Sequence, residues 1–221
     1  YGPGLMWEMA GEKIKKLSGK ITMGTSAKEF IYDESKKIWI VKCFNKINNL
    51  NITYECKRII CSAPLKDVVI NISPPLLSKP LAYKLKYRDF ITVAIMIDRR
   101  PAFDDNWIYI HDHDINAGRI QNYTSWSSHM APIDKGCLGL EYFCNEGENF
   151  WNKSDEKLKE IAIDDLNKLQ ILTNEKIIDT YVVRQKKAYP VYDQNYKEIV
   201  SKIFQACQKD PKLLLKFSYG L

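Results

Sequence analysis

Side chains suited to binding a polar ligand gather in the stretch Val182–Asp193, where an arginine and two tyrosines surround a proline. Its first residues are β-branched and predict a strand. Pro190 fixes the backbone between Tyr189 and Tyr192, so both phenols hold defined positions near Arg184. Phenols and a guanidinium supply hydrogen bonds to oxygen-rich ligands. We therefore expect these side chains to contact a polar ligand, with a packed corner of the fold as the alternative.

A second polar and aromatic cluster lies on a predicted strand over residues 119–123 and in the loop that follows it. The cluster contains Arg119, Gln121, Asn122, Trp126 and His129. These side chains can hydrogen-bond a substrate if the strand faces a ligand. A solvated edge strand with one packed tryptophan explains the same pattern, and both interpretations stay open.

Two further motifs contain chemistry-bearing residues. His111-Asp112-His113-Asp114 has the residue types of a metal site. In a strand, however, the histidines share one face and the aspartates share the other, so we expect a polar surface turn and no metal site. Glu141 lies in an apolar strand over residues 137–144, with no second feature that makes it a base. The catalytic residues stay unassigned.

Hydrophobic spacing predicts the elements that position these residues. Apolar residues at helical spacing, with Gly19 as a stop and Ser154 as an N-cap, predict helices over residues 6–17, 154–169 and 195–207. Strands are predicted over residues 20–23, 27–32, 38–44, 53–61, 90–97, 107–110, 119–123, 137–144, 177–184 and 213–217. Polar and apolar alternation between Gly and Asp turns favours antiparallel sheets, and residues 58–61 are expected to form a buried strand.

Composition bounds the class of protein. The 221 residues are 45% hydrophobic and carry a net charge of +6 that is spread along the chain, so no nucleic-acid partner is expected. No apolar run reaches the roughly 18 residues of a membrane span. The six cysteines form no CxxC pair, which favours reduced thiols and a cytoplasmic location. The oligomeric state stays unassigned.

Three segments together resemble a known superfamily. They are Gly2-Pro3-Gly4-Leu5-Met6-Trp7-Glu8, Tyr87-Arg88-Asp89-Phe90-Ile91-Thr92-Val93-Ala94 and Arg184-Gln185-Lys186-Lys187-Ala188-Tyr189-Pro190-Val191-Tyr192-Asp193. They resemble the middle of FAD-dependent amine oxidoreductases, nearest to the protoporphyrinogen-oxidase-like and UDP-galactopyranose-mutase-like members. Residues 105–111 and 118–123 also fit, and the likeness spans nearly the whole chain.

The resemblance implies an α+β fold. A β-meander from an FAD-binding domain would be followed by a substrate domain with a mainly antiparallel sheet flanked by helices. Residues 1–64 would belong to the FAD-binding domain, residues 65–184 to the substrate domain, and residues 185–221 would return to the FAD-binding domain. The chain begins at Tyr1 without an initiator methionine, and we interpret it as an internal piece of such a protein.

FAD is the cofactor that the resemblance implies. The strand Ala27–Phe30 corresponds to the family's adenine-contacting strand, so the backbone of Ala27 would contact the cofactor, together with Ala63 and Pro64. The family's GxGxxG fingerprint and its C-terminal glycine-rich segment do not occur in this sequence. The FAD site is therefore expected to be incomplete in this chain.

The resemblance implies a flavin-dependent oxidoreductase that transfers a hydride from a small-molecule substrate to FAD. Its substrate cavity would be lined by Asn122, Trp126, Arg184, Tyr189 and Tyr192. As an alternative, a flavin-dependent sugar-nucleotide mutase would use Arg88, Arg119 or Arg184 to bind a diphosphate. A non-catalytic module is the third possibility, and we expect this piece of the protein to be inactive by itself.

Overall fold

The computed structural model describes residues 2–209 and 216–217. The chain divides into two compact units. Unit 1 comprises Tyr1–Gly19 and Arg88–Tyr189, and unit 2 comprises Lys20–Tyr87 and Pro190–Leu221. The chain thus changes unit after residues 19, 87 and 189. The sequence predicted domain boundaries after residues 64 and 184. Residues 65–87 belong to unit 2 because their apolar side chains enter its core.

Unit 1 is built on a five-stranded sheet with the order β10-β6-β9-β8-β7. Its strands are β6 (Tyr87–Ile97), β7 (Trp107–Tyr109), β8 (Arg119–Asn122), β9 (Gly136–Cys144) and β10 (Ile177–Pro190). The pairs β6 with β9, β9 with β8 and β8 with β7 are all antiparallel. This confirms the predicted α+β class and the mainly antiparallel sheet. The predicted strand over residues 177–184 is correct in type but extends to Pro190.

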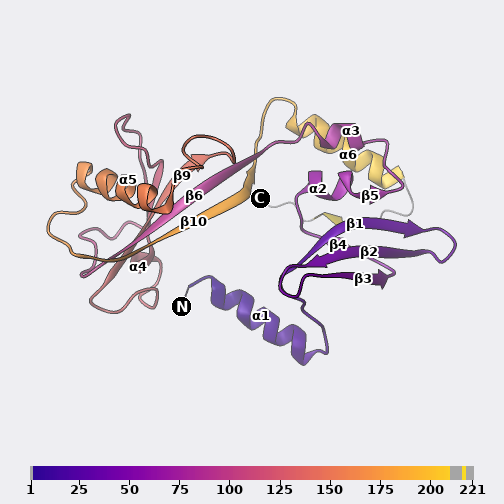
Figure 1. Ribbon diagram of the computed structural model, residues 1–221, viewed down its shortest axis with the longest axis horizontal. Helices are drawn as coiled ribbons and strands as arrows, with labels where there is room; N and C mark the ends of the chain where they lie inside the picture. Colours follow the sequence, from indigo (N-terminus) through magenta and orange to yellow (C-terminus); the bar gives the residue numbers. More distant parts are fainter. Residues whose placement is uncertain (1, 210–215, 218–221) are drawn as a thin grey trace. The chain divides into compact units, whose positions relative to one another are not determined.

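One face of this sheet is covered by the helix α5 (Asp155–Lys168), as Figure 1 shows. Alternate residues of β6 and β9 are buried on this face, and they pack with the apolar stripe of the helix. The main contributors are Ile91, Val93, Ile95, Leu138, Leu140, Leu158, Ala162 and Leu166. Ser154 caps the helix by accepting a hydrogen bond from the amide of Lys157, as its sequence predicted.

Two further helices belong to unit 1. They are α1 (Gly4–Lys16) and the short α4 (Tyr123–Trp126). The sequence predicted α1, which ends where Ser18 adopts a positive φ of 64°. Its apolar side chains are not part of a core, since Met6, Met9 and Leu17 are all exposed.

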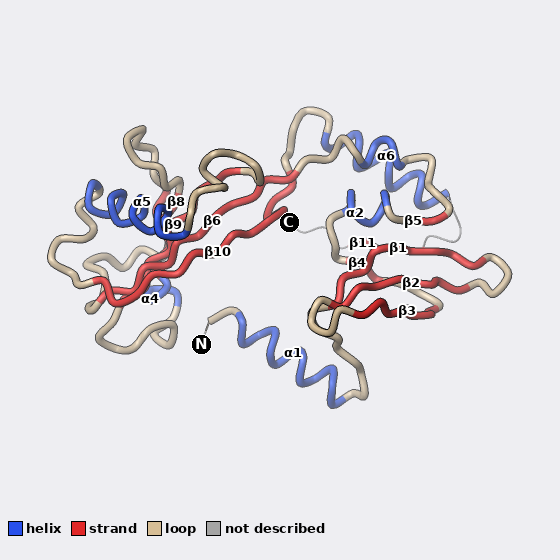
Figure 2. The backbone as a smooth tube through the Cα atoms, in the orientation of Figure 1, coloured by secondary structure: helices blue, strands red, loops and turns tan. Residues whose placement is uncertain are grey.

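Unit 2 contains a four-stranded sheet with the order β3-β2-β1-β5, covered on one face by helices (Figure 2). The sheet is formed by β1 (Thr25–Asp33), β2 (Ile38–Asn45), β3 (Leu50–Cys56) and β5 (Ile72–Ser73). The helices are α2 (Leu65–Ile70), α3 (Lys79–Ala82) and α6 (Tyr196–Lys209). A two-residue parallel pair joins β4 (Ile60–Cys61) to β11 (Lys216–Phe217). The predicted β-meander is therefore present as β1 to β3.

Three predicted strands of unit 2 differ from the structure. Residues 20–23 are irregular because β2 ends at Asn45, opposite Thr25, and offers no partner to the residues before it. Residues 53–61 split into β3 and β4, and Ile60 is 86% exposed, so the expected buried strand is wrong. Of the predicted strand over 213–217, only residues 216–217 are strand, and residues 213–215 lie outside the described residues.

All six cysteines are free thiols. Burial raises the pKa of Cys43, Cys137 and Cys144, which keeps these three thiols protonated and unreactive. They act as small apolar side chains in strands, as expected from the sequence.

A buried carboxylate ties α5 to the loop before β8. Asp165 is fully buried and accepts hydrogen bonds from the amides of Asn116 and Ala117 at 3.1 and 3.0 Å. It also accepts one from the phenol of Tyr142 at 3.1 Å. Burial, with Asp165 beside it, raises the pKa of Tyr142 and keeps the phenol protonated as a donor.

We predict that Asp165→Ala lowers the free energy of unfolding by about 3 kcal/mol or more, because the buried amide of Ala117, the buried phenol of Tyr142 and the part-buried amide of Asn116 lose their acceptor. The neighbouring Asp164→Ala is a matched control, since Asp164 forms an exposed pair with Lys168. Its effect should stay within about 0.5 kcal/mol. Urea unfolding followed by circular dichroism measures both, and equal effects would contradict this role for Asp165.

A second carboxylate, Glu175, holds the loop before β10. It accepts a hydrogen bond from Nε of Arg99 at 2.9 Å and others from the amides of Thr173 and Asn174. The hydrogen bond from Arg99, followed by that from Thr173, lowers the pKa of Glu175 from its ordinary 4.5 to about 2.

Because this pKa is lower in the folded protein, the contribution of Glu175 to stability is present above about pH 4.5 and is lost as the pH falls to about 2. We predict that Glu175→Gln lowers the urea midpoint at pH 7 and that this difference shrinks between pH 4.5 and pH 2. The exposed Glu156→Gln serves as the control. A difference that stays constant with pH would show that the charge of Glu175 is not responsible.

Candidate functional site

The face of the five-stranded sheet opposite α5, called here the open face, carries polar and aromatic side chains. Strand register places them beside one another, since Thr92 and Arg119 both lie opposite Glu141 on β9, and Tyr109 lies opposite Arg119. The open face includes Phe90, Thr92, Trp107, Tyr109, Arg119, Gln121, Gly139, Glu141, Phe143 and Tyr189. Side chains alternate between the two faces of each strand, so the residues between those buried in the core point to the open face.

A buried ion pair lies at the centre of the open face. Arg119 is 8% exposed and Glu141 is 2% exposed. Nε of Arg119 donates to Oε2 of Glu141 at 2.6 Å, and Nη2 donates to the same oxygen. The other carboxylate oxygen accepts a hydrogen bond from the side-chain amide of Gln121. Both oxygens of Glu141 are therefore engaged.

The guanidinium of Arg119 is also surrounded by aromatic rings. Its Cζ atom lies 4.6 Å from the ring centre of Trp107, 5.5 Å from that of Phe143 and 5.9 Å from that of Tyr109. These distances are typical of cation–π contacts. Burial by itself lowers the pKa of Arg119, but hydrogen bonds with Tyr189 and Glu141 outweigh burial and raise it. The side chain is a permanent cation.

Tyr189 comes from β10 and completes the cluster. Its hydroxyl accepts a hydrogen bond from Nη2 of Arg119 at 3.3 Å, and its ring lies 6.0 Å from that of Phe90. The strand is held just before this residue, where Lys187 has a positive φ of 52° and donates its amide to Asp89 at 2.6 Å. Asp89 also accepts the amide of Glu146 at 2.7 Å, so it fixes the course of β10 toward Tyr189.

The helix α4 adds two aromatic side chains, Trp126 and Tyr123, next to the open face. Trp126 packs edge-on against Trp107, with ring centres 5.5 Å apart. At Gly139, a Cβ atom would lie 2.5 Å from the phenol oxygen of Tyr123, so only glycine lets this ring rest on the sheet. Burial raises the pKa of Tyr123 to about 12. Its phenol therefore stays neutral.

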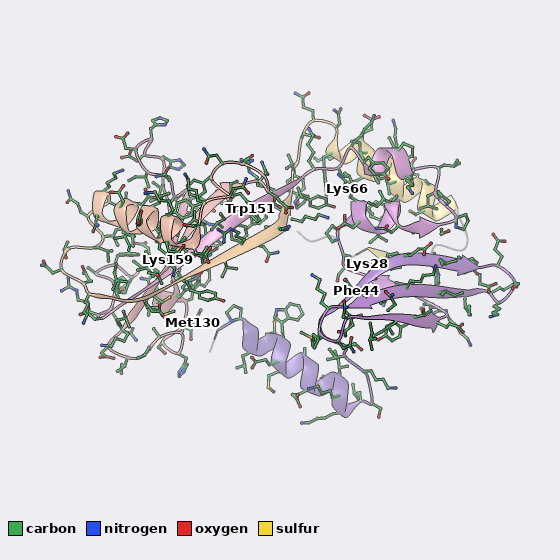
Figure 3. All side chains as sticks on the ribbon, viewed as in Figure 1. Lys28, Phe44, Lys66, Met130, Trp151 and Lys159 are labelled. Atoms are coloured by element: carbon green, nitrogen blue, oxygen red, sulfur yellow. The ribbon has the colours of Figure 1, made fainter. Side chains whose placement is uncertain are left out.

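Two of the expected substrate-binding residues lie away from the open face. Arg184 donates to the carbonyls of Trp151 and Lys153, at 3.3 and 2.7 Å, and pairs with Asp155 at 2.5 Å. These contacts attach β10 to the start of α5; Figure 3 labels Trp151. The buried Asn122 lies opposite Leu138 on the covered face, and its amide donates to the carbonyl of Phe103 at 2.9 Å. We do not include either residue in the candidate site.

The remaining expected residues lie in unit 2. Tyr192 is exposed and packs edge-on against Tyr196, with ring centres 4.8 Å apart. Ala27 is exposed on β1 at a bulge that takes Lys28, labelled in Figure 3, out of the ladder with β2. Ala63 is exposed and Pro64 half-buried in the connection from β4 to α2. Of the five expected substrate-binding residues, the structure brings only Tyr189 and Trp126 to the cluster.

Sequence reasoning did not identify Glu141, Trp107, Tyr109 and Phe143 as one cluster with Arg119. Side chains alternate between the two faces of a strand, so the sequence could predict which residues of a single strand share the open face. It could not predict the register between strands, because that register depends on pairing between segments that are far apart in the sequence.

The described residues contain neither a metal-binding group nor a membrane-crossing helix. His111-Asp112-His113-Asp114 forms an exposed turn, in which the carboxylate of Asp112 accepts the amide of Asp114. Within residues 2–209 and 216–217, no three His, Cys, Asp or Glu side chains are arranged to hold a metal ion. In the same part of the chain, every helix is too short or too polar to cross a membrane.

No protein-family model matches the chain, and no curated protein matches its sequence. Solved structures match its fold. Reduced UDP-galactopyranose mutase aligns with a TM-score of 0.76 and 15% identity over 94% of this chain and 44% of its own. A protein named as a protoporphyrinogen oxidase from Exiguobacterium sp. 255-15 aligns with a TM-score of 0.71 and 14% identity, over 94% and 45%. Wild-type putrescine oxidase bound to putrescine aligns with a TM-score of 0.55 and 14% identity, over 80% of this chain and 38% of its own.

These likenesses show that the chain has the fold of the corresponding part of these proteins. The chain spans less than half the length of each of these three proteins. The shared fold agrees with the superfamily that the sequence resembles.

We predict that Arg119→Met lowers the free energy of unfolding by about 3–5 kcal/mol, because it leaves the charge of Glu141 buried without its partner. The double variant Arg119→Met/Glu141→Leu removes both charges and should recover most of this loss. Lys157→Met is the control, since it breaks an exposed pair with Glu160. Chemical unfolding measures all three, and a double variant as unstable as the single one would show that the rings, not the charges, dominate.

Proposed function

We propose that this chain is part of a flavin-dependent oxidoreductase that transfers a hydride from a small-molecule substrate to FAD. The observation that carries the proposal is the likeness of 94% of the chain to UDP-galactopyranose mutase and to the protein named as a protoporphyrinogen oxidase. The resemblance of the three sequence segments supports the same superfamily. Six free cysteines favour a cytoplasmic location.

In this proposal the open face of unit 1 binds the substrate. Tyr189 and Trp126 contact it as expected from the sequence, joined by Trp107 and Tyr109. Glu141 is not a base, because both of its oxygens already accept hydrogen bonds from Arg119 and Gln121. The residues of this chain would therefore orient the substrate and exclude water, rather than move a proton.

Unit 2 would contribute to the binding of FAD. Ala27 is exposed and lies beside a bulge that takes Lys28 out of the ladder with β2. Ala63 is exposed, and its small side chain lets a cofactor approach the backbone, next to Pro64. These features fit the contacts that the resemblance assigns to Ala27, Ala63 and Pro64. When bound, FAD would supply the acceptor for the hydride with its two electrons, and the oxidised substrate would release one proton.

A flavin-dependent sugar-nucleotide mutase is the second candidate, favoured by the likeness to UDP-galactopyranose mutase. It requires arginines that are available to a diphosphate. Arg119 is paired with Glu141, and Arg184 is bound to Asp155 and two carbonyls. Of the three arginines considered, Arg88 is the exposed one whose side chain forms no hydrogen bond with the described residues. The paired state of the other two favours the oxidoreductase.

The test is to purify the intact protein and record its absorption spectrum. We expect the yellow absorption of oxidised flavin, and bleaching in a single anaerobic turnover when a substrate is added. Binding of UDP-galactose without bleaching would favour the mutase. A colourless protein that takes up no FAD would contradict both and support a non-catalytic module.

The FAD contacts are tested by Ala63→Glu in the intact protein. A carboxylate at this exposed position repels the cofactor's diphosphate, and we expect FAD binding to weaken by about tenfold or more, about 1.4 kcal/mol. Asn48→Glu adds the same charge to an exposed turn of the same unit and should leave FAD affinity unchanged. Fluorescence titration of the apoprotein with FAD gives both values. Equal affinities would exclude Ala63 from the site.

A further inference from the structure

Arg119 occupies the position that a bound cation takes in an aromatic cage. The rings of Trp107, Tyr109 and Phe143 surround its Cζ atom at 4.6–5.9 Å. Sites that bind alkylammonium ligands place such rings around the ligand's own charge. In this chain the cage is filled from within.

The internal cation is fixed in this cage. Glu141 neutralises it through the bonds from Nε and Nη2, and Tyr189 accepts a further bond. Expelling Arg119 would leave Glu141 charged, buried and without its main partner. A positively charged substrate would therefore have to displace a group that the sheet holds in place.

An anionic substrate is also disfavoured at this position. The guanidinium already directs three hydrogen bonds to Glu141 and Tyr189. A carboxylate or phosphate that approached it would meet the charge of Glu141 at short range, where like charges repel strongly. The ion pair thus presents no net charge to a ligand.

What remains accessible is ring surface. Trp107, Tyr109, Phe143 and Tyr189 are between 40% and 61% exposed, although they belong to the cluster around the buried pair. Trp107 and Tyr109 are stacked with an angle of 21° between their planes, so they present nearly parallel surfaces. Such surfaces favour the flat face of another ring.

We propose that the open face binds a flat, uncharged ring system, and that Arg119 excludes alkylammonium substrates by filling the aromatic cage itself. This inference rests on the proposed function, for which it names the substrate class. The reacting carbon would belong to a ring, and the side chains of Trp107 and Tyr109 would set the orientation of that ring.

The first test measures binding to the 221-residue chain. N-phenyl-1-naphthylamine is an arylamine with two flat ring systems that is uncharged at neutral pH and fluoresces on binding to apolar surfaces. We expect saturable binding that neither tetramethylammonium nor benzoate displaces. Trp107→Ala and Tyr109→Ala should weaken it by about tenfold or more, whereas Tyr83→Ala, which removes an exposed tyrosine of unit 2, should not. Binding that is unchanged in both site variants would overturn the proposal.

The second test empties the cage. Arg119→Ala/Glu141→Gln removes the internal cation and its countercharge together, and should raise the affinity for tetramethylammonium by about tenfold or more. Arg119→Met/Glu141→Gln is the matched control, because methionine refills the cage without charge and should give no gain. Near-ultraviolet circular dichroism checks that both variants fold.

Wild-type chain that binds tetramethylammonium more tightly than the ring probe would overturn the proposal whether or not the variants fold. The flavin content of the intact protein is a separate measurement. Flavin retained without ring binding contradicts this inference alone, whereas a protein without flavin contradicts the proposed function.

Discussion

The buried ion pair between Arg119 and Glu141 requires an exact register between the strands of unit 1. Removing both charges from water costs several kcal/mol for each ion, so the pair adds little net stability and depends on good geometry. That geometry comes from the register of β8 on β9, which places the two residues directly opposite each other. Gln121 and Tyr189 then complete the hydrogen bonds from neighbouring positions. A slip of β8 by one residue would turn Arg119 toward the apolar core and leave Glu141 without its partner.

The two faces of this sheet contribute differently to stability. Burial of apolar residues under α5 supplies the main favourable free energy, at about 25 cal/mol for each Å² removed from water. This allows the open face to hold a charged pair and half-exposed rings that contribute much less. Asp165 and Arg184 attach α5 to the loops and to β10, so the covered face stays closed. The arrangement of the open face is thus a consequence of packing on the opposite side.

The sequence was informative wherever structure is local. The period of α5 and α6, the cap at Ser154 and the apolar run of β6 gave correct elements, because each depends on neighbours within a few residues. Residues 20–23 failed because a strand also needs a partner. Arg184 and Asn122 were expected to contact a ligand, and the structure shows that their side chains donate hydrogen bonds to backbone carbonyls. A polar side chain can form hydrogen bonds, but the tertiary fold decides whether its partner is a ligand, another side chain or the backbone.

The state of Glu141 connects the geometry of the open face to the proposed chemistry. An enzyme that depends on acid–base catalysis needs a group that is free to take a proton, and the central carboxylate of this face is committed to Arg119 and Gln121. Hydride transfer to a cofactor does not require such a group, because the electron pair travels with the hydrogen. What it does require is a substrate held in a single orientation. In the proposed function, the rings around the neutralised arginine would hold the substrate in this way, and a flat, uncharged substrate is the class that we propose for them.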